Sequence, residues 1–294
     1  MLREYAVDPD AIYRNLDTLH RFVTDFNAEN GRVVSAIPRK WLAQQKNLIK
    51  GLQLGPVAKT RVLGKLEKIN DVSLINGYTI PAQLVNWIDQ ALHVKNGANL
   101  NAIISTQVCA QNQIYDYANM FAHEPNHWEI DKTISVQRVA ADMANAISHS
   151  LRLATCVYYV DPYFTPSDNR FVAPLMAFIQ KIQQGKTKIV TIHTTDKNCD
   201  RAGFINGLNL IIKPLLPAGL TLKLFIWQRP QIHDRYILTK NVGYSFGHGL
   251  DEAEYAAALN VNIDRLGESA RKEQFRYFSA KDDLNDNVIS ITGQ

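Results

Sequence analysis

Residues 232–252 read IHDRYILTKNVGYSFGHGLDE, and this stretch predicts a β-hairpin. Its two β-prone runs, 233–239 and 242–249, are separated by the pair Lys240-Asn241. The pair is not the Asn-Gly sequence that favours the tightest hairpin turns, so a β-bulge remains an alternative that would shift the register by one residue. The hairpin itself follows from the two runs and the polar residues between them.

The register of this hairpin decides which side chains lie together. A regular turn places His233 opposite His248 and Arg235 opposite Phe246. Because alternate residues of a strand share a face, His233 and Arg235 point to the same side. We therefore expect two histidines and one arginine to form a cluster.

The chemistry of this cluster suits phosphate. An imidazole exchanges protons near neutral pH or attacks phosphorus, and a guanidinium holds phosphate oxygens as a fork. The glycines at 247 and 249 let a ligand approach the backbone closely. The alternative is a structural pair in which Arg235 bridges to Asp234 or Asp251.

The chain around the hairpin predicts an α/β domain. Runs of alternating strands and helices are typical of a layered domain with a largely parallel sheet. The expected strands are 155–160, 188–193, 220–227 and 288–292, and the expected helices are 135–151, 171–184, 202–215 and 267–279.

Two polar residues stand at or near the ends of the first two strands. Asp161 follows the first strand, and His193 ends the second. Open α/β sheets bind ligands at the carboxyl ends of their strands, so both are candidate supporting residues. The alternatives are that Asp161 caps the turn at Pro162 and that His193 is an exposed strand-end histidine.

Residues 1–131 predict a smaller, α-rich (α+β) domain, and residues 132–294 predict the α/β domain. The polar, proline-containing stretch 122–133 marks the junction. Helices are expected after Asp8-Pro9 and at 39–51, 57–69 and 81–94, with short strands at 33–37 and 100–105.

The N-terminal domain carries a basic segment. Between Arg32 and Lys68 there are nine basic residues and one acid, Glu67. With Trp41, Leu48 and Leu52 interleaved, this pattern suits contact with the phosphates of nucleic acid, although lysines on helices more often form a solvated face. The candidate phosphate-binding residues are Arg39, Lys40, Lys46, Lys50, Lys59, Arg61 and Lys65.

A metal site is not expected. Residues 123–127, HEPNH, match the letters of the H-E-x-x-H zinc motif. That motif needs both histidines on one helix face, and Pro125 between them interrupts a helix. The three cysteines form no C-x-x-C pair. No cofactor is expected either.

Residues 155–292 resemble one half of a phospholipase D superfamily fold, which implies an α/β/α layered domain with a mixed sheet. The resemblance rests on the strand ending in Asp161-Pro162-Tyr163-Phe164 and on the tripeptides HDR (233–235) and GLD (249–251). Within the superfamily, these two tripeptides look most like those of the phospholipase D-like domains at the C-terminus of some microtubule-interacting-and-transport domain proteins and of bacterial proteins. In the pattern H-x-K-x4-D-x6-G-S-x-N, His233 and Gly247 match, Arg235 replaces lysine, and Lys240, His248 and Leu250 replace aspartate, serine and asparagine.

The resemblance implies a metal-independent phosphodiesterase, in which one histidine attacks phosphorus and a second protonates the leaving oxygen. It implies His233 as nucleophile or acid, Arg235 as the phosphate clamp and His248 as a second acid–base group. With one motif visible, it implies that a two-histidine site needs either a homodimer that brings two copies of His233 together or the recruitment of His248. The candidates to replace the missing aspartate are Asp251, Glu252 and Glu254, just beyond the second strand of the hairpin.

Three functions remain open from the sequence. The first is a nuclease, a hydrolase of nucleic acid that by analogy belongs to antiviral defence and has an operon-encoded protein as a candidate partner. The second is a catalytically inactive module that binds phosphate groups of nucleic acid, anionic lipid or a protein. The third is an assembly subunit whose activity does not depend on His233.

Composition sets the remaining bounds. Hydrophobic residues make up 46% of the chain, which excludes disordered and fibrous classes. The net charge of +4 is too small to indicate nucleic-acid binding by itself. With no apolar run of transmembrane length and no signal pattern, we expect a soluble cytoplasmic protein.

Overall fold

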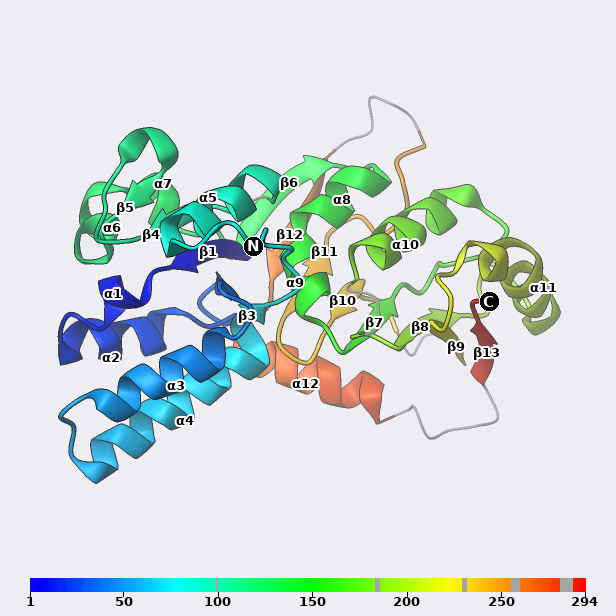
Figure 1. Cartoon of the computed structure of the whole chain (residues 1–294). Coiled ribbons are helices and arrows are strands. Elements are labelled where there is room, and N and C mark those ends of the chain that lie inside the picture. Colours follow the sequence, from blue (N-terminus) through cyan, green and yellow to red (C-terminus); the bar gives the residue numbers. More distant parts are fainter. Residues whose placement is uncertain (99, 183–185, 229–231, 255–259, 281–287) are drawn as a thin grey trace. The chain divides into compact units, whose positions relative to one another are not determined.

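The computed structural model describes residues 1–294 except 99, 183–185, 229–231, 255–259 and 281–287. The chain divides into two compact units, residues 2–130 and residues 131–294, and Met1 is grouped with the second. Each unit has its own sheet (Figure 1). No helix among the described residues is long and apolar enough to cross a membrane.

The N-terminal unit is α-rich with short strands, as expected, but its five strands form one parallel sheet instead of an α+β arrangement. The expected strands at 33–37 and 100–105 correspond to two of the five, and two of the missed strands have only two residues, too few for a periodic pattern. The order of the sheet is β3-β2-β1-β4-β5. The strands are β1 (Arg3–Val7), β2 (Arg32–Ser35), β3 (Leu74–Ile75), β4 (Ala102–Ile104) and β5 (Ile114–Tyr115).

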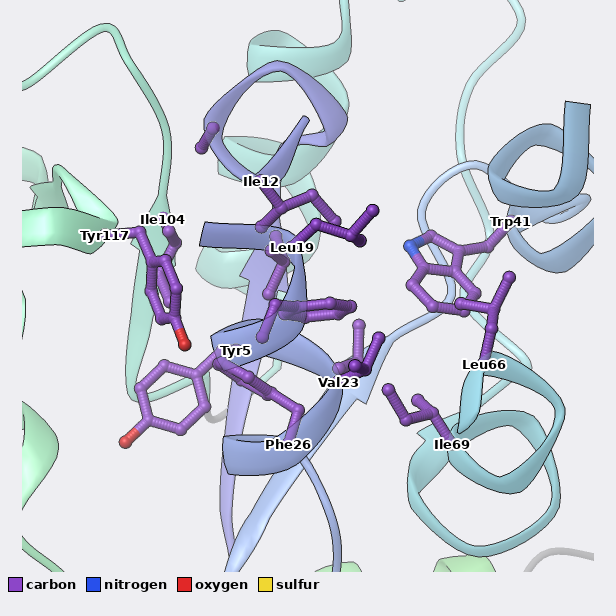
Figure 2. Close-up of a cluster of buried hydrophobic side chains, with 14 of the residues drawn as sticks. Tyr5, Ile12, Leu19, Val23, Phe26, Trp41, Leu66, Ile69, Ile104 and Tyr117 are labelled. Atoms are coloured by element: carbon purple, nitrogen blue, oxygen red, sulfur yellow. The ribbon is translucent and has the colours of Figure 1, made fainter. Parts of the chain in front are cut away.

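Helices cover both faces of this sheet. Because side chains alternate between the two faces along β1, Tyr5 and Val7 pack in one core cluster, and Ala6 packs in a second cluster that includes Ala91 and Val94. Figure 2 shows the first cluster, in which Trp41 lies among aliphatic side chains. The helices are α1 (Pro9–Ile12), α2 (Leu16–Asp25), α3 (Trp41–Gly51), α4 (Pro56–Ser73), α5 (Trp87–Gly97), the 3-10 turn η1 (Ala110–Asn112), α6 (Tyr117–His123) and α7 (Pro125–Trp128).

The C-terminal unit is also α/β, as expected, and its eight-stranded sheet is mixed. The order is β13-β9-β8-β7-β10-β11-β12-β6. The sheet is therefore mixed and not largely parallel: β7, β8 and β9 run parallel, as expected, and the other neighbours are antiparallel. The strands are β6 (Thr133–Gln137), β7 (Cys156–Val160), β8 (Ile189–Thr195), β9 (Thr221–Trp227), β10 (Tyr236–Leu238), β11 (Gly243–Phe246), β12 (Asn260–Arg265) and β13 (Val288–Thr292).

Helices also cover both faces of the C-terminal sheet. The ring of Tyr159 packs against Phe178 of α10, whereas the ring of Tyr158 packs against Phe275 of α12. The expected helix over 135–151 was wrong at its start, because Thr133–Gln137 forms the edge strand β6. The helices are α8 (Ala140–Ala146), α9 (Ser148–Leu153), α10 (Asn169–Lys181), α11 (Arg201–Gly207), the π turn η2 (Leu208–Ile212), the 3-10 turn η3 (Lys213–Leu215) and α12 (Glu268–Ser279).

The predicted hairpin register is confirmed. Tyr236 pairs with Ser245 and Leu238 with Gly243, which is the pairing of a turn centred on Lys240-Asn241 without a bulge. The strands are shorter than expected, so His233 and His248 lie beyond the ladder.

Candidate functional site

The candidate site lies where β7 ends and β10 begins. These two strands are antiparallel neighbours, with Val160 opposite Tyr236. The next pair in this register is Asp161 and Arg235. The sheet therefore brings together an acid and a base that are 74 positions apart in the sequence.

The carboxyl group of Asp161 is buried and binds two backbone N–H groups. Its side chain is 1% exposed, and it accepts hydrogen bonds from the backbone N–H of Tyr163 at 2.9 Å and of Leu250 at 3.2 Å. Burial raises its pKa to about 6, although the two N–H donors and the charge of Arg235 lower it. The carboxyl group thus holds the turn after β7 against the loop after β11.

Arg235 lies beside Asp161 without forming an ion pair in the described part of the chain. Its guanidinium carbon is 4.8 Å from the centroid of the Tyr163 ring. Its Nε is buried and has no hydrogen-bond partner. The alternative in which Arg235 bridges to Asp234 or Asp251 is not what the structure shows. Asp234 accepts a hydrogen bond from the hydroxyl of Tyr236, and Asp251 binds other arginines.

A second cation shares the Tyr163 ring. The ammonium nitrogen of Lys197 is 4.3 Å from the ring centroid. Lys197 follows β8, and the loop that carries it is tied to the loop after β7, because Asn198 donates to the Tyr163 carbonyl at 2.9 Å and Thr195 donates to the Pro162 carbonyl at 2.6 Å. We call Tyr163, Lys197 and Arg235 the cationic cluster.

The sequence reasoning missed two members of this cluster. Tyr163 belongs to the quoted stretch after the first strand, but no pattern distinguishes it from a core aromatic residue. Lys197 lies four residues after His193 in an ordinary polar loop. The available signal was their position after neighbouring parallel strands, where open α/β sheets bind ligands.

The two hairpin histidines are exposed. The backbone N–H of Phe246 donates to the carbonyl of Arg235 at 3.0 Å, which extends the predicted register by one pair. Beyond that pair, no hydrogen bond joins His233 and His248 to each other or to a carboxylate among the described interactions. The expected cluster of two histidines and Arg235 is therefore not held together by a hydrogen bond in this part of the chain.

Two of the three acids proposed to replace the missing motif aspartate hold other groups. Asp251 binds Arg138 through one carboxylate oxygen and Arg170 through the other, the latter at 2.5 Å. Glu252 accepts a hydrogen bond from the backbone N–H of Ala140 at 2.7 Å. These contacts fix the loop after β11 to α8 and α10.

Gly249 is required by this loop. Its φ is +122°, and a Cβ at this position would lie 2.6 Å from the Oδ1 atom of Asp251. The glycine expected to let a ligand approach instead makes room for the carboxylate of Asp251.

The expectation that His193 is an exposed strand-end histidine was wrong. His193 lies inside β8, is fully buried, and is surrounded by the rings of Tyr158, Phe225, Trp227 and Phe278. The indole N–H of Trp227 donates to its Nδ1 at 3.0 Å, which requires an unprotonated Nδ1. Burial lowers its pKa to about 3, so it is a neutral core residue and does not face the cationic cluster.

The basic segment of the N-terminal unit is distributed over α3, α4 and the turn before them. Three of its candidates are engaged: Lys46 pairs with Glu67, Lys59 donates to the Lys50 carbonyl at 2.9 Å, and Lys65 donates to Thr24 at 3.3 Å. Trp41 is buried, which corrects its expected place on a phosphate-binding surface (Figure 2). The exposed cations of the segment without a described side-chain partner are Arg39, Lys40, Lys50, Arg61 and Lys68.

The zinc-like string is divided between two helices. His123 ends α6, Pro125 begins α7, and Glu124 between them has a non-helical backbone conformation. His127 contacts the Asn101 carbonyl at 3.2 Å. Within the described ranges, no group of three or more His, Cys, Asp or Glu side chains is placed to hold a metal ion.

Comparisons with known proteins give no family for this chain. No family model matches it, and no curated protein does. Among solved structures, one similar chain is TrmBL2, described as an archaeal chromatin protein with a novel mode of DNA binding. The similarity covers 78% of this chain and 83% of that one, at 13% identity and a TM-score of 0.28.

Proposed function

We propose that the C-terminal unit binds phosphate groups of nucleic acid at the cationic cluster and does not cleave them. The observation that carries this proposal is that two cations, Arg235 and Lys197, share one tyrosine ring at the carboxyl ends of the parallel strands β7 and β8, and neither has a described carboxylate partner. A guanidinium and an ammonium group without acid partners are the groups that hold phosphate. The phospholipase D-like character suggested by the sequence is part of the same proposal.

The geometry also supports binding over hydrolysis. Nucleophilic or acid–base catalysis by an imidazole needs a third group to orient the ring. His233 and His248 are exposed without a described carboxylate partner, and Asp251 and Glu252 are bound elsewhere. The alternative from the sequence, a catalytically inactive module, is therefore the stronger of the two.

Binding to a fluorescein-labelled single-stranded DNA oligonucleotide, followed by anisotropy, tests this function. Arg235→Gln and Lys197→Gln are each expected to weaken binding by about tenfold or more, because hydrogen bonds to charged groups contribute about 1.5–3 kcal/mol. Arg276→Gln, which removes an exposed arginine of α12, serves as the matched control and should bind as the native chain does. Equal affinity of Arg235→Gln and the native chain would contradict the proposal.

A phosphodiesterase is the second candidate, and the exposure of both His233 and His248 favours it, because a substrate can reach them. The same oligonucleotide, incubated in excess chelator and separated on a gel, distinguishes the two. We expect an intact oligonucleotide. Cleavage that is lost in His233→Ala and kept in Arg276→Gln would replace the binding proposal by a histidine-dependent nuclease.

The cluster also predicts a pH dependence of binding. Asp161 has a raised pKa of about 6, so it becomes neutral as the pH falls through that value and stops opposing an anion at Arg235. Binding of a phosphodiester, which does not itself titrate here, should strengthen between pH 7 and pH 5. The test uses the His233→Gln/His248→Gln background, so that neither hairpin imidazole contributes to the change.

In that background, Asp161→Asn should remove the remaining increase in affinity below pH 7. An increase that persists in Asp161→Asn would mean that another group controls binding. The asparagine retains one acceptor oxygen for the two backbone N–H groups, so circular dichroism of the variant must accompany the titration.

The N-terminal unit contributes a second candidate contact to this proposal. Four of its exposed cations have no described side-chain partner: Arg39 and Lys40 lie just before α3, Lys50 lies near the end of α3, and Arg61 lies in α4. Such a surface suits a polyanion without sequence preference.

A further inference from the structure

A small pocket lies between α2 and α4 in the N-terminal unit. The end of α2, the turn after it and one side of α4 line this pocket, and its volume is about 180 Å³. We call it the α2–α4 pocket. Because pockets for drug-sized ligands begin at about 300 Å³, this one has the size for a smaller group, such as one ring system.

The floor of the α2–α4 pocket is apolar. Its floor residues are Val23, Phe26 and Ile69, which are buried members of the first core cluster (Figure 2). An apolar lining with a few polar groups around it is the usual composition of a small-molecule site. A flat apolar group therefore suits this floor.

Lys65 and Lys68 form a cationic rim at the same pocket. They are three residues apart on α4, so their side chains occupy neighbouring positions on one helix face. None of the described lining residues is acidic. Three acids that flank the lining residues in sequence have other described partners, namely Tyr117 and Arg21 for Asp25, Lys46 for Glu67, and Asn70 for Asp71. An anion between the two lysines would remove the repulsion between their charges.

The two lysines are not needed to neutralise the C-terminal end of α2. A helix C-terminus attracts cations, so this is the alternative role for them. The Thr24 carbonyl in the last turn already accepts from the side-chain amides of Asn27 at 2.9 Å and Asn30 at 3.0 Å. Lys65 donates to the hydroxyl of Thr24 at 3.3 Å, and Lys68 has no described partner. Both ammonium groups therefore remain accessible to a ligand.

The amide of Asn27 has spare hydrogen-bonding capacity at the side of the pocket. Its Nδ2 donates to the Thr24 carbonyl, and its Oδ1 accepts from the backbone N–H of Asn30 at 2.7 Å. A primary amide has two donor hydrogens and two acceptor lone pairs, so one of each is unused among the described hydrogen bonds. This donor and acceptor match the edge of an adenine ring, which offers one acceptor and one donor and which asparagine reads in bidentate geometry.

We propose that the α2–α4 pocket binds adenosine monophosphate, either free or as the end of a nucleic-acid strand. The base lies on the apolar floor with its edge toward Asn27, and the phosphate lies between Lys65 and Lys68. A phosphate monoester carries nearly two negative charges at neutral pH, which matches two lysines better than the single charge of an internal phosphodiester does. The pocket shares no residue with the cationic cluster, so this inference does not rest on the proposed function and either can fail alone.

Isothermal titration calorimetry of the full chain with adenosine monophosphate tests the site. The Arg235→Gln background excludes a contribution of the cationic cluster. Adenosine and ribose phosphate each lack one half of the ligand and are expected to bind about tenfold more weakly or worse. Guanosine monophosphate should bind at least about fivefold more weakly, because its edge offers two acceptors to Asn27.

Lys65→Gln and Lys68→Gln are each expected to weaken binding of adenosine monophosphate by about tenfold. Both side chains are exposed, so circular dichroism should show the native fold. Lys95→Gln is the matched control, because Lys95 lies on α5, whose core residues pack on the other face of the sheet. Unchanged affinity in Lys68→Gln would overturn the proposal. Equal affinity for ribose phosphate and adenosine monophosphate would also overturn it, since the floor would then contribute nothing.

Competition separates the two sources of the nucleotide. An oligoadenylate with a terminal phosphate that displaces adenosine monophosphate, when the same oligoadenylate without that phosphate does not, assigns the pocket to the end of a strand. If neither competes, the pocket takes the free nucleotide. Displacement by both would show binding of internal phosphodiesters and would overturn the assignment of a monophosphate.

Discussion

Replacing Asp251 by asparagine is expected to lower the free energy of unfolding of the C-terminal unit by roughly 3 kcal/mol. Asp251 is buried and binds two arginines, and removing one member of a buried ion pair typically costs about 3–5 kcal/mol. The lower end of that range applies because the side chain of Arg170 is 36% exposed. The loss reflects the guanidinium of Arg138 losing its described counter-charge and that of Arg170 keeping only the exposed carboxylate of Glu254.

Hydrogen exchange during urea denaturation, measured on peptides of β7 and β10, reports on this unit separately from the N-terminal unit. Glu254→Gln is the matched control, because Glu254 is 61% exposed and 3.4 Å from Arg170. We expect that control to change stability by less than about 0.5 kcal/mol. Equal midpoints for the two variants would mean that Asp251 does not hold the loop after β11 and is free to serve the site.

The second large effect is the loss of stability of the C-terminal unit in mild acid. The pKa of His193 is about 3 in the folded unit, against an ordinary value of 6.5. Between these values the unfolded chain binds a proton that the folded chain does not, so stability is complete above pH 6.5 and falls as the pH is lowered. The contribution of His193 by itself reaches a few kcal/mol over this range, because one pKa unit corresponds to about 1.4 kcal/mol. Protonation of Asp161 in the folded unit offsets part of this loss below about pH 6.

His193→Gln tests this effect, because glutamine keeps an acceptor for the indole N–H of Trp227 but does not titrate. Between pH 6.5 and pH 5 the variant should lose the downward slope of stability. Its slope should even reverse, because the raised pKa of Asp161 makes the folded unit bind a proton more readily than the unfolded chain.

His248→Gln provides the control for that experiment, since His248 is exposed and its loss should leave the native pH dependence in place. The measurement is again the urea midpoint of the β7 and β10 peptides at each pH. A native slope in His193→Gln would show that another group causes the acid sensitivity.

The sequence determined the features that depend on neighbours along the chain. The hairpin register followed from the turn at Lys240-Asn241, because a short turn without a bulge leaves one way to pair its strands. The parallel group β7, β8 and β9 followed from alternating strand and helix patterns. The break between His123 and His127 followed from Pro125, whose ring and missing N–H act locally.

The tertiary structure decided what each polar residue does. His193 and Asp161 stand at or near the ends of similar strands, yet aromatic rings enclose the first and two backbone N–H groups bind the second. The sequence left Asp251 as a candidate site residue, but in the folded unit its carboxylate binds Arg138 and Arg170. Lys197 follows β8 and Arg235 precedes β10, and the two lie close together because β7 pairs with both strands. Burial and charge pairing depend on residues that are far apart in sequence, and local patterns carry no information about them.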